Sequence, residues 1–351
     1  VKLPENRSLA IWLAAKAVFS YDLVMDITLF SRFNKDWRPG AIKLQKAGGQ
    51  TNSNWFLQYK NRKFFVRLPW QTGAGIVNRK AEAGNIAALY RHKKLAGILP
   101  KCYFYIFKKR NIVAPKIVKR FDLPDGAAVF ECLEGRDING QDLEKPKVQE
   151  ALLETLSIFH NGGVKFVNEY DVFRDEIAKY KNKAKKYPIG KLIGRAEIEK
   201  IEAIEKEVKK QLLIAGTIST HNDLIFENIR LGKDGKVYLL DFEYAGYNIR
   251  NGLYYDLGIL LGGNLFQKNP MTLPVFEQLM KKAEKIYGQP LDRQKIYAGA
   301  ITNILVMFWW GLVKYFSSET EEDKKYFAIY VKKRAKKLSW LFTQSIDFVN
   351  Q

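Results

Sequence analysis

The sequence predicts an α+β fold of two lobes, a small β-rich lobe followed by a larger, mainly helical one, with a helical extension in front of them. Three observations support this prediction. The chain has 351 residues, of which 47% are hydrophobic and 27% charged, so it can bury a substantial core. Strand-like segments are concentrated in residues 41–133. In residues 134–351, most apolar side chains recur at helical spacing.

The predicted extension covers residues 1–40. Its apolar residues, such as Trp12 and Phe30, recur at loosely helical spacing until Arg38-Pro39-Gly40 breaks the pattern. Lys16 interrupts an apolar stretch near the start, and no small-residue cleavage site clearly follows, so we do not expect a signal peptide. We interpret the extension as a candidate for peripheral membrane contact or for homodimer formation.

The small lobe, predicted for residues 41–133, has the pattern of several strands, one helix and further strands. A Lys60-Asn61-Arg62 turn separates two of the strand-like runs, as in a hairpin. Strands are expected at Ile42–Gln45, Trp55–Tyr59, Lys63–Leu68, Cys102–Phe107, Pro115–Arg120 and Ala127–Cys132, and the helix at Arg79–Leu95.

The large lobe, predicted for residues 134–351, is mostly helical, with one interruption. There a Lys233-Asp234-Gly235 turn separates two short strands. The apolar segment Ile301–Phe316 is short for a bilayer and contains Asn303 and Lys314, so we interpret it as a core helix. Helices are expected at Pro146–His160, Val172–Lys186, Glu197–Ala215, Leu273–Tyr287, Arg293–Phe316 and Glu322–Val349, and the two strands at Asn228–Leu231 and Val237–Leu240.

The chain carries a large excess of positive charge. Its 58 Lys and Arg residues outnumber its 37 Asp and Glu residues, which gives a formal net charge of +21. Such a field attracts nucleotides, phosphorylated metabolites, anionic lipids and nucleic acids alike, so it identifies no partner. No familiar nucleic-acid-binding motif is present, and we expect no nucleic-acid partner. Cys102 and Cys132 lack metal-ligand spacing and are expected to be free thiols in a reducing, cytoplasmic compartment.

The strongest functional signal is a set of three polar residues. Asn228 follows Asp223 by five positions, and Asp241 follows it by 18 positions, after a predicted hairpin. In protein kinases, an Asp and an Asn at this spacing face the substrate hydroxyl and a metal ion, and a second, metal-binding Asp comes later in the chain. The spacing therefore predicts phosphoryl transfer.

The residues around this set resemble a known family. His221–Asn228 and the run Leu240–Asn248, which contains Glu-Tyr-Ala-Gly-Tyr, resemble the signature of choline and ethanolamine kinases, in particular the LicA-type choline kinases of bacteria. The wider aminoglycoside phosphotransferase superfamily shares the first half of this pattern. The resemblance covers roughly residues 44–316. It implies a protein-kinase-like fold and the ATP- and Mg²⁺-dependent transfer of phosphate to the hydroxyl of a small molecule.

The resemblance also implies roles for individual residues. Asp223 would be the catalytic base, and Asn228 and Asp241 would hold Mg²⁺. Arg67 stands in place of the usual kinase lysine, with Glu82 as its ion-pair partner. The residues implied in nucleotide binding are Gly49, Gln50, Thr51 and Asn52 in a glycine-containing turn, Arg67 and Glu82, and Glu131 and Leu133 in the hinge between the lobes.

Aromatic residues near these motifs are candidates for the acceptor site, because each aromatic face attracts a quaternary ammonium by about 0.5–2 kcal/mol. Val313 stands where choline kinases have a second Trp after Trp310-Gly311-Leu312. Trp309, or a C-terminal aromatic residue such as Tyr315, Tyr326 or Tyr330, could replace that ring. Choline is the favoured acceptor, and ethanolamine and thiamine stay open. An aminoglycoside is less favoured because the C-terminal half is rich in lysine. The candidate acceptor-binding residues are Tyr244, Tyr247, Tyr254, Trp309 and Trp310, with Glu243 as an assisting carboxylate or a further metal ligand.

A function of a different class stays open from the sequence alone. The chain could be a non-catalytic protein that binds anions or a membrane surface on the same fold. The intact set of Asp223, Asn228 and Asp241 argues against this alternative. Two neighbouring residues are interpreted as structural, His221 as a hydrogen-bonding brace of the catalytic loop and Asp256 as a helix cap or an ordering group.

Overall fold

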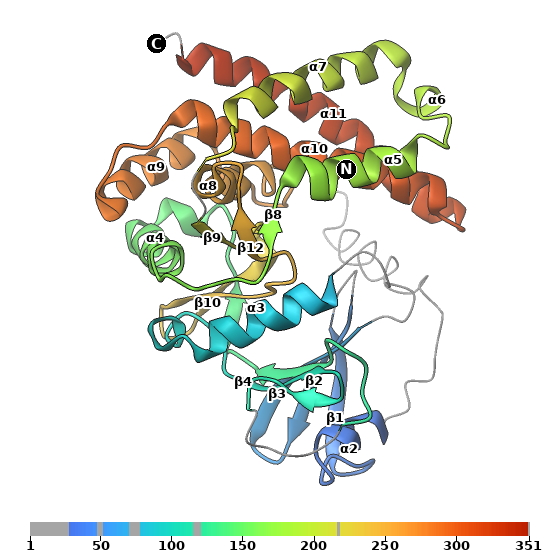
Figure 1. Cartoon of the computed structure of the whole chain (residues 1–351), viewed down its shortest axis with the longest axis vertical. Coiled ribbons are helices and arrows are strands. Elements are labelled where there is room, and N and C mark those ends of the chain that lie inside the picture. Colours follow the sequence, from blue (N-terminus) through green and yellow to red (C-terminus); the bar gives the residue numbers. More distant parts are fainter. Residues whose placement is uncertain (1–27, 48–51, 70–77, 115–120, 216–217, 350–351) are drawn as a thin grey trace, which may run out of the picture.

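The computed structural model describes residues 28–47, 52–69, 78–114, 121–215 and 218–349. These residues form a β-rich lobe, at the bottom of Figure 1, and a larger helical lobe above it. Helix α3 (Arg79–Arg91) lies between the small-lobe sheet and the large lobe in this view. The two-lobed α+β fold predicted from the sequence is confirmed.

The small lobe is built on a six-stranded sheet of order β1-β2-β3-β6-β4-β5, in which neighbouring strands are antiparallel. The predicted hairpin is present, and Lys60, with a φ of 52°, provides its left-handed turn. The predicted strand Pro115–Arg120 lies outside the described residues. The strands are β1 (Ile42–Ala47), β2 (Asn52–Tyr59), β3 (Arg62–Pro69), β4 (Cys102–Phe107), β5 (Arg110–Asn111) and β6 (Ala128–Glu131).

The pleat of β3 separates core residues from residues of the cleft. Phe64, Val66 and Leu68 are buried in the small-lobe core. Phe65 and Arg67 alternate with them and line the cavity between the lobes. Because successive side chains of a strand point to opposite faces, the register of β3 alone brings Arg67 to the site.

The described end of the predicted extension belongs to the small-lobe core. Phe30 and Phe33 of α2 (Thr28–Phe33), and Trp37 after it, are at most 2% exposed. The ring of Phe30 meets that of Trp55 on β2 edge-on, with centroids 6.3 Å apart. Residues 1–27, and with them most of the extension, lie outside the described residues.

Helix α3 is fixed at its start by an N-cap. The side chain of Asn78 accepts a hydrogen bond from the backbone N–H of Ala81 at 3.1 Å. The sequence predicts a helix that continues to Leu95, but α3 ends at Arg91 and a short 3₁₀ turn, Lys93–Leu95, follows it.

The large lobe is mainly helical, as predicted. Two of its helices have the predicted bounds, and the predicted helix at Val172–Lys186 begins instead as a π-helical turn, Val172–Ile177, capped by Asp171. The helices are α4 (Pro146–His160), α5 (Ala178–Ala184), α6 (Gly190–Ile193), α7 (Arg195–Gln211), α8 (Gly252–Gly262), α9 (Leu273–Tyr287), α10 (Arg293–Ser317) and α11 (Glu321–Val349).

Helix α10 lies in the interior of this lobe. Among the described residues it is the one helix long and apolar enough to cross a membrane, but 78% of its apolar window is buried inside the protein. It packs against α8, α11, α7 and α5. Its apolar character is therefore accounted for by the core of the lobe, in agreement with the core helix predicted there.

Helix α8 was not predicted, and its packing explains why. Apart from Asp256, it is apolar or aromatic around its whole circumference, so it lacks the one-sided periodicity that marks a helix in a sequence. A Cβ at Gly262 would come within 2.2 Å of the backbone oxygen of Ala300, and one at Gly258 within 2.5 Å of the backbone nitrogen of the same residue. These glycines allow α8 to approach α10 closely.

Two small sheets position the motif residues. The predicted strands around the Lys233–Gly235 turn are β10 (Ile229–Gly232) and β11 (Val237–Leu239), which form a sheet with β7 (Gly135–Asp137). The other sheet joins β8 (Glu169–Tyr170), β12 (Gly246–Asn248) and β9 (Ile218–Thr220). The catalytic loop begins directly after β9, and Asp241 lies between β11 and β12.

Candidate active site

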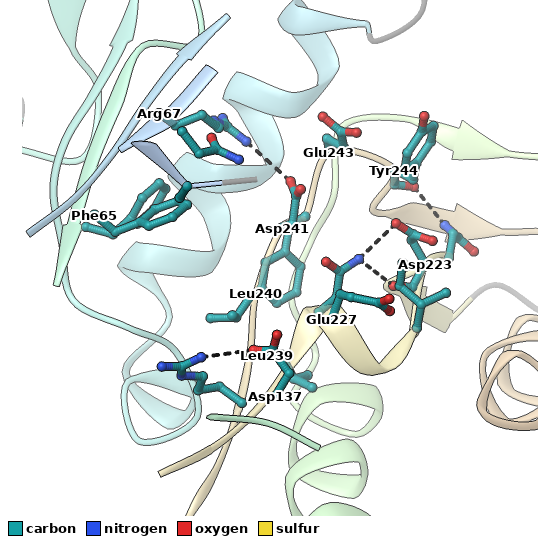
Figure 2. Close-up of a pocket in the computed structure, with 18 of the residues that line it drawn as sticks. Phe65, Arg67, Asp137, Asp223, Glu227, Leu239, Leu240, Asp241, Glu243 and Tyr244 are labelled. Atoms are coloured by element: carbon teal, nitrogen blue, oxygen red, sulfur yellow. Dashed lines mark hydrogen bonds and ion pairs between the residues drawn. The ribbon is translucent and has the colours of Figure 1, made fainter. Parts of the chain in front are cut away.

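A cavity of about 940 Å³ lies between the two lobes. Strands β1, β2, β3 and β6 line it on the small-lobe side, and the loops around Asp223 and Asp241 line it on the other. Figure 2 shows Arg67 above Asp241, with Asp223 to one side and Glu243 and Tyr244 above it. The three motif residues predicted from their spacing, Asp223, Asn228 and Asp241, therefore meet in one cavity.

The side chain of Asn228 bridges the catalytic loop. Its Nδ2 donates hydrogen bonds to Oδ2 of Asp223 at 2.8 Å and to the backbone oxygen of the same residue at 2.9 Å. The amide nitrogen is thus used to hold Asp223 in place. The amide oxygen is the atom of Asn228 that could ligate a cation.

Asp241 is held in a left-handed backbone conformation, with a φ of 55°, that a non-glycine residue adopts only at a cost of about 1–3 kcal/mol. The residue before it is fixed on both sides. The backbone oxygen of Leu240 accepts a hydrogen bond from Nε2 of His221 at 2.7 Å. The backbone N–H of Leu240 donates to the backbone oxygen of Asn228 at 2.9 Å. The surrounding loop therefore imposes the strained conformation that turns the Asp241 carboxylate into the cavity.

Asp256 of α8 orders the start of the catalytic loop. Its carboxylate accepts the backbone N–H groups of His221 and Asn222, each at 2.8 Å, and it lies 3.0 Å from Nε2 of His160. Asn222 itself has a φ of 65°. Burial lowers the pKa of His221, which keeps the imidazole neutral as a donor to Leu240. The structural interpretations of His221 and Asp256 agree with this arrangement.

A buried network of charged side chains fixes the position of Arg67 in the site. Nη2 of Arg67 and Nη1 of Arg79 each donate to the Glu82 carboxylate at 2.6 Å, and Nη1 of Arg67 lies 3.4 Å from Oδ1 of Asp241. Burial alone would raise the pKa of Glu82, but the two guanidinium groups hold it below its ordinary value. Glu82 and Arg67 therefore form a buried ion pair rather than a surface pair, as the family resemblance implied.

Three carboxylates of the site have pKa values above their ordinary range, because they are buried and lie near other acidic groups. Burial, and then the charge of Asp241, raises the pKa of Asp223 to about 7. Burial also raises the pKa of Asp241, although Arg67 opposes this shift, and burial together with Asp241 raises that of Glu243. A divalent cation between these oxygen donors would relieve the repulsion.

The donor set fits Mg²⁺ better than a metal held by the protein alone. No group of three or more His, Cys, Asp or Glu side chains within the described ranges could hold a metal ion. Mg²⁺ in phosphotransferases needs only one or two carboxylates, because substrate phosphates and water complete its coordination. Asp241 and Asn228, next to a cavity with space for phosphates, meet this requirement.

The structure places the predicted nucleotide residues in four different situations. Glu131, Leu133 and Arg67 line the cavity. Asn52 does not, because its buried side chain accepts a hydrogen bond from Arg79 at 2.8 Å and donates one to Glu243 at 3.3 Å. Glu82 acts behind Arg67, as described above. Gly49, Gln50 and Thr51 lie outside the described residues.

The part of the cavity beyond Asp223 is rich in aromatic side chains, and we call it the acceptor compartment. Trp310, Tyr244 and Glu243, all predicted from the sequence, line it. Its further lining residues, which are not among the candidate acceptor-binding residues given above, are Tyr170, Glu176, Tyr180, Tyr255, Asn303, Val306, Met307, Lys314 and Tyr330.

Three predicted acceptor residues do not line this compartment. Trp309 is 2% exposed and lies on the other side of α10, where Nζ of Lys181 is 5.0 Å from its ring centroid. The hydroxyl of Tyr247 donates to the backbone oxygen of Val164 at 3.3 Å. The ring of Tyr254 lies beneath Nζ of Lys295, 5.5 Å from its centroid. Neighbouring helical positions differ by about 100° in direction, so only one of two adjacent Trp residues can face the cavity.

Of these residues, Tyr330 carried some signal in the sequence, and Glu176 carried none. Tyr330 was one of several aromatic residues considered as a replacement for the missing second Trp, and it packs 5.6 Å from Trp310 between ring centroids. Glu176 is a nearly buried carboxylate that accepts a hydrogen bond from Lys179 at 2.7 Å. No short motif connects these two residues to the catalytic loop.

Comparisons with known proteins agree with the geometry of the site. A family model described as choline/ethanolamine kinase matches residues 45–285. Protein LicA of Haemophilus influenzae is 27% identical over 216 residues, which is 59% of this chain and 55% of that protein. A probable ethanolamine kinase of Arabidopsis thaliana is 30% identical over 175 residues, 45% of this chain and 46% of the relative. The chain thus spans about half the length of these two relatives.

A solved structure extends the likeness to the fold. The crystal structure of choline kinase LicA from Streptococcus pneumoniae superposes with a TM-score of 0.63 at 21% identity, over 86% of this chain and 94% of that one. At this level of identity the superposition supports the shared two-lobed fold.

Proposed function

We propose that this chain, which belongs to the choline/ethanolamine kinase family, transfers the γ-phosphate of ATP to the hydroxyl of a small amino alcohol, with choline as the favoured acceptor. One observation carries the proposal. Asp223 lines a single cavity that has Arg67 and the hinge residues on one side and an aromatic compartment on the other. This is the arrangement required to bring a nucleotide phosphate and an acceptor hydroxyl to the same carboxylate.

The nucleotide would bind on the small-lobe side. Phe65 and Phe130 provide apolar surface for a base, next to the hinge at Glu131–Leu133. The N–H of Glu131 is already bonded to the oxygen of Lys101 at 2.8 Å, so recognition of the base edge would use other backbone groups of the hinge. Arg67, fixed by Glu82, provides a permanent positive charge for the phosphates.

Asn228 and Asp241 would hold Mg²⁺, which neutralises the charge of the phosphate oxygens when it is bound. The residues of the protein position the ligand oxygens and compensate part of the negative charge of the site. Arg67 touches Asp241 at 3.4 Å and reduces the repulsion among the carboxylates. The left-handed backbone conformation of Asp241 is present without a ligand, so its carboxylate needs no rearrangement to bind the metal ion.

Asp223 would act as the catalytic base. The hydroxyl oxygen of the acceptor forms a bond to the γ-phosphorus while the bond from that phosphorus to the β,γ-bridging oxygen breaks, which releases ADP. The hydroxyl proton passes to the Asp223 carboxylate as this happens. The hydrogen bond from Asn228 to Oδ2 at 2.8 Å orients the carboxylate for this role.

Aromatic faces and a carboxylate support an amino-alcohol acceptor. Trp310, Tyr330 and Tyr244 line the compartment, and ring faces of this kind attract a quaternary ammonium. Glu176 lies in the same compartment and could accept hydrogen bonds from a primary ammonium, so ethanolamine is the second candidate.

The proposal is tested by measuring ADP release with Mg-ATP and choline, ethanolamine, thiamine or kanamycin, with the mass of each product determined. We expect turnover with choline or ethanolamine and phosphorylated product of the matching mass. Turnover with kanamycin alone would assign the chain to antibiotic phosphorylation instead. ATP binding without turnover on any of the four would overturn the proposed acceptor class.

A further inference from the structure

A lysine side chain lines the acceptor compartment. Lys314 lies one helical turn after Trp310 on α10, and both residues face the cavity. Nζ of Lys314 is 5.6 Å from the centroid of the Trp310 ring. At this distance an ammonium group is attracted to an aromatic face. The indole of Trp310 therefore has a cation of the protein beside it before any acceptor binds.

The charge of Lys314 has little local compensation. It forms no ion pair with any carboxylate in the described part of the chain, and burial lowers its pKa, an effect that the charge of Asp323 only partly offsets. The charge of Lys295, on the same helix, is compensated by an ion pair. Its Nζ also lies over an aromatic ring, that of Tyr254, but it pairs with Asp292 at 3.1 Å and is outside the cavity. The position of Lys314 in the cavity is thus not simply that of a solvated surface lysine.

The compartment presents two electrostatic environments to a cationic acceptor. The carboxylates of Asp223 and Glu176 attract an ammonium group, although Lys179, 2.7 Å from Glu176, compensates part of the charge of Glu176. Lys314, next to Trp310, repels one. A primary ammonium can donate hydrogen bonds to Glu176 and depends less on the ring faces. A quaternary ammonium has no N–H group and depends on those faces.

We propose that Lys314 is a specificity-determining residue that weakens the binding of a quaternary ammonium by holding a resident cation at the face of Trp310. This inference rests on the proposed function, because it concerns the acceptor of the same site. Its consequence is a discrimination between amines: Lys314 raises the KM for choline more than the KM for ethanolamine. The inference also assigns the effect to one neighbour of Trp310, because Lys314 lines the same cavity with its Nζ 5.6 Å from the centroid of this ring.

The test compares Lys314→Met, which removes the charge and keeps an unbranched side chain, with Lys314→Arg, which keeps the charge. We expect Lys314→Met to lower the KM for choline about fivefold, with a smaller decrease for ethanolamine and no change in the KM for ATP. Lys314→Arg should behave like the original protein. Added salt should reduce the difference in the KM for choline between the original protein and Lys314→Met, because it screens the repulsion from Lys314 that only the original protein exerts.

Lys295→Met is the matched control, since it removes another lysine of α10 that lies over an aromatic ring, that of Tyr254 on α8, but outside the cavity. It should leave both acceptor KM values unchanged. An unchanged or higher KM for choline in folded Lys314→Met would overturn the inference. So would a rise in the KM for ATP, because it would show that Lys314 serves the phosphates.

Direct binding separates this inference from the proposed function. Tetramethylammonium has the head group of choline but no hydroxyl, so its binding can be followed by calorimetry whether or not the protein turns over an amino alcohol. Tighter binding of tetramethylammonium to Lys314→Met than to the original protein would support the inference even if all four acceptors failed. Equal binding to both proteins would contradict it, even if choline were phosphorylated.

Discussion

The carboxylate of Asp256 accepts the backbone N–H of His221 at 2.8 Å, across 35 residues of sequence. The second oxygen of the same carboxylate accepts the N–H of Asn222, and Nε2 of His160 lies 3.0 Å away. A completely buried side chain of α8 thus fixes the two residues that precede Asp223. The position of the proposed catalytic base depends on this contact between a helix and a loop.

Asp256→Asn is therefore expected to destabilise the protein by about 3 kcal/mol, because an amide offers one acceptor oxygen where two backbone N–H groups need partners. Urea unfolding followed by circular dichroism measures this change. His160→Gln is a suitable comparison, since it removes one partner of Asp256 and leaves both backbone contacts in place. Asp256→Asn with unchanged stability would mean that the loop does not need the carboxylate.

Asp223→Asn tests the proposed base. It keeps the size of the side chain but cannot accept the hydroxyl proton, so we expect turnover with the best acceptor to fall about 1,000-fold. The KM for ATP should stay close to that of the original protein. Glu227→Gln, at an exposed position of the same loop that also lines the cavity, is the control and should keep most of the activity. Turnover near the original rate in folded Asp223→Asn would exclude this carboxylate as the base.

Asp241→Asn tests the proposed metal ligand. Removing one carboxylate should raise the Mg²⁺ concentration needed for half-maximal activity, by about 100-fold if the carboxylate is a direct ligand. A Mg²⁺ titration of ADP release at saturating ATP measures this shift. The circular dichroism of the variant should match that of the original protein, which separates loss of a metal ligand from misfolding. An unchanged Mg²⁺ requirement would assign Asp241 to pairing with Arg67 alone.

The sequence predicted what depends on short-range spacing. Asp223 and Asn228 are five residues apart, and the loop that holds them is closed by a bond between their own side chains. The bounds of α4 were predicted because Pro146 starts the helix at a position where its missing N–H is harmless. Arg67 was assigned from the family resemblance, and the structure shows that alternation along β3 turns it toward the cavity.

The acceptor compartment could not be predicted in the same way, because its walls come from segments with no fixed spacing. Glu176 lies on a π-helical turn and Tyr330 on α11, more than 150 residues later. Their meeting depends on how α5, α10 and α11 pack. The sequence also could not decide between Trp309 and Trp310, since the helical rotation of α10 is set by its contacts on both sides.

These two Trp residues give the last prediction, because they separate binding from packing on one helix. Trp310 lines the acceptor compartment and packs against Tyr330 and Phe327, whereas Trp309 is 2% exposed and lies in the core. Trp310→Leu should raise the acceptor KM about tenfold through the loss of an aromatic face, with little effect on the KM for ATP. Trp309→Leu should instead lower the stability by about 2 kcal/mol and leave both KM values near their original size.

Steady-state kinetics and urea unfolding on both variants distinguish the two roles. A pure packing role for Trp310 would give equal changes in the two KM values together with a loss of stability. The two variants remove the same side chain from adjacent positions, so a general effect of losing an indole from α10 would be the same in both. If the two rings face different directions, Trp310→Leu should change the acceptor KM and Trp309→Leu should change the stability against urea.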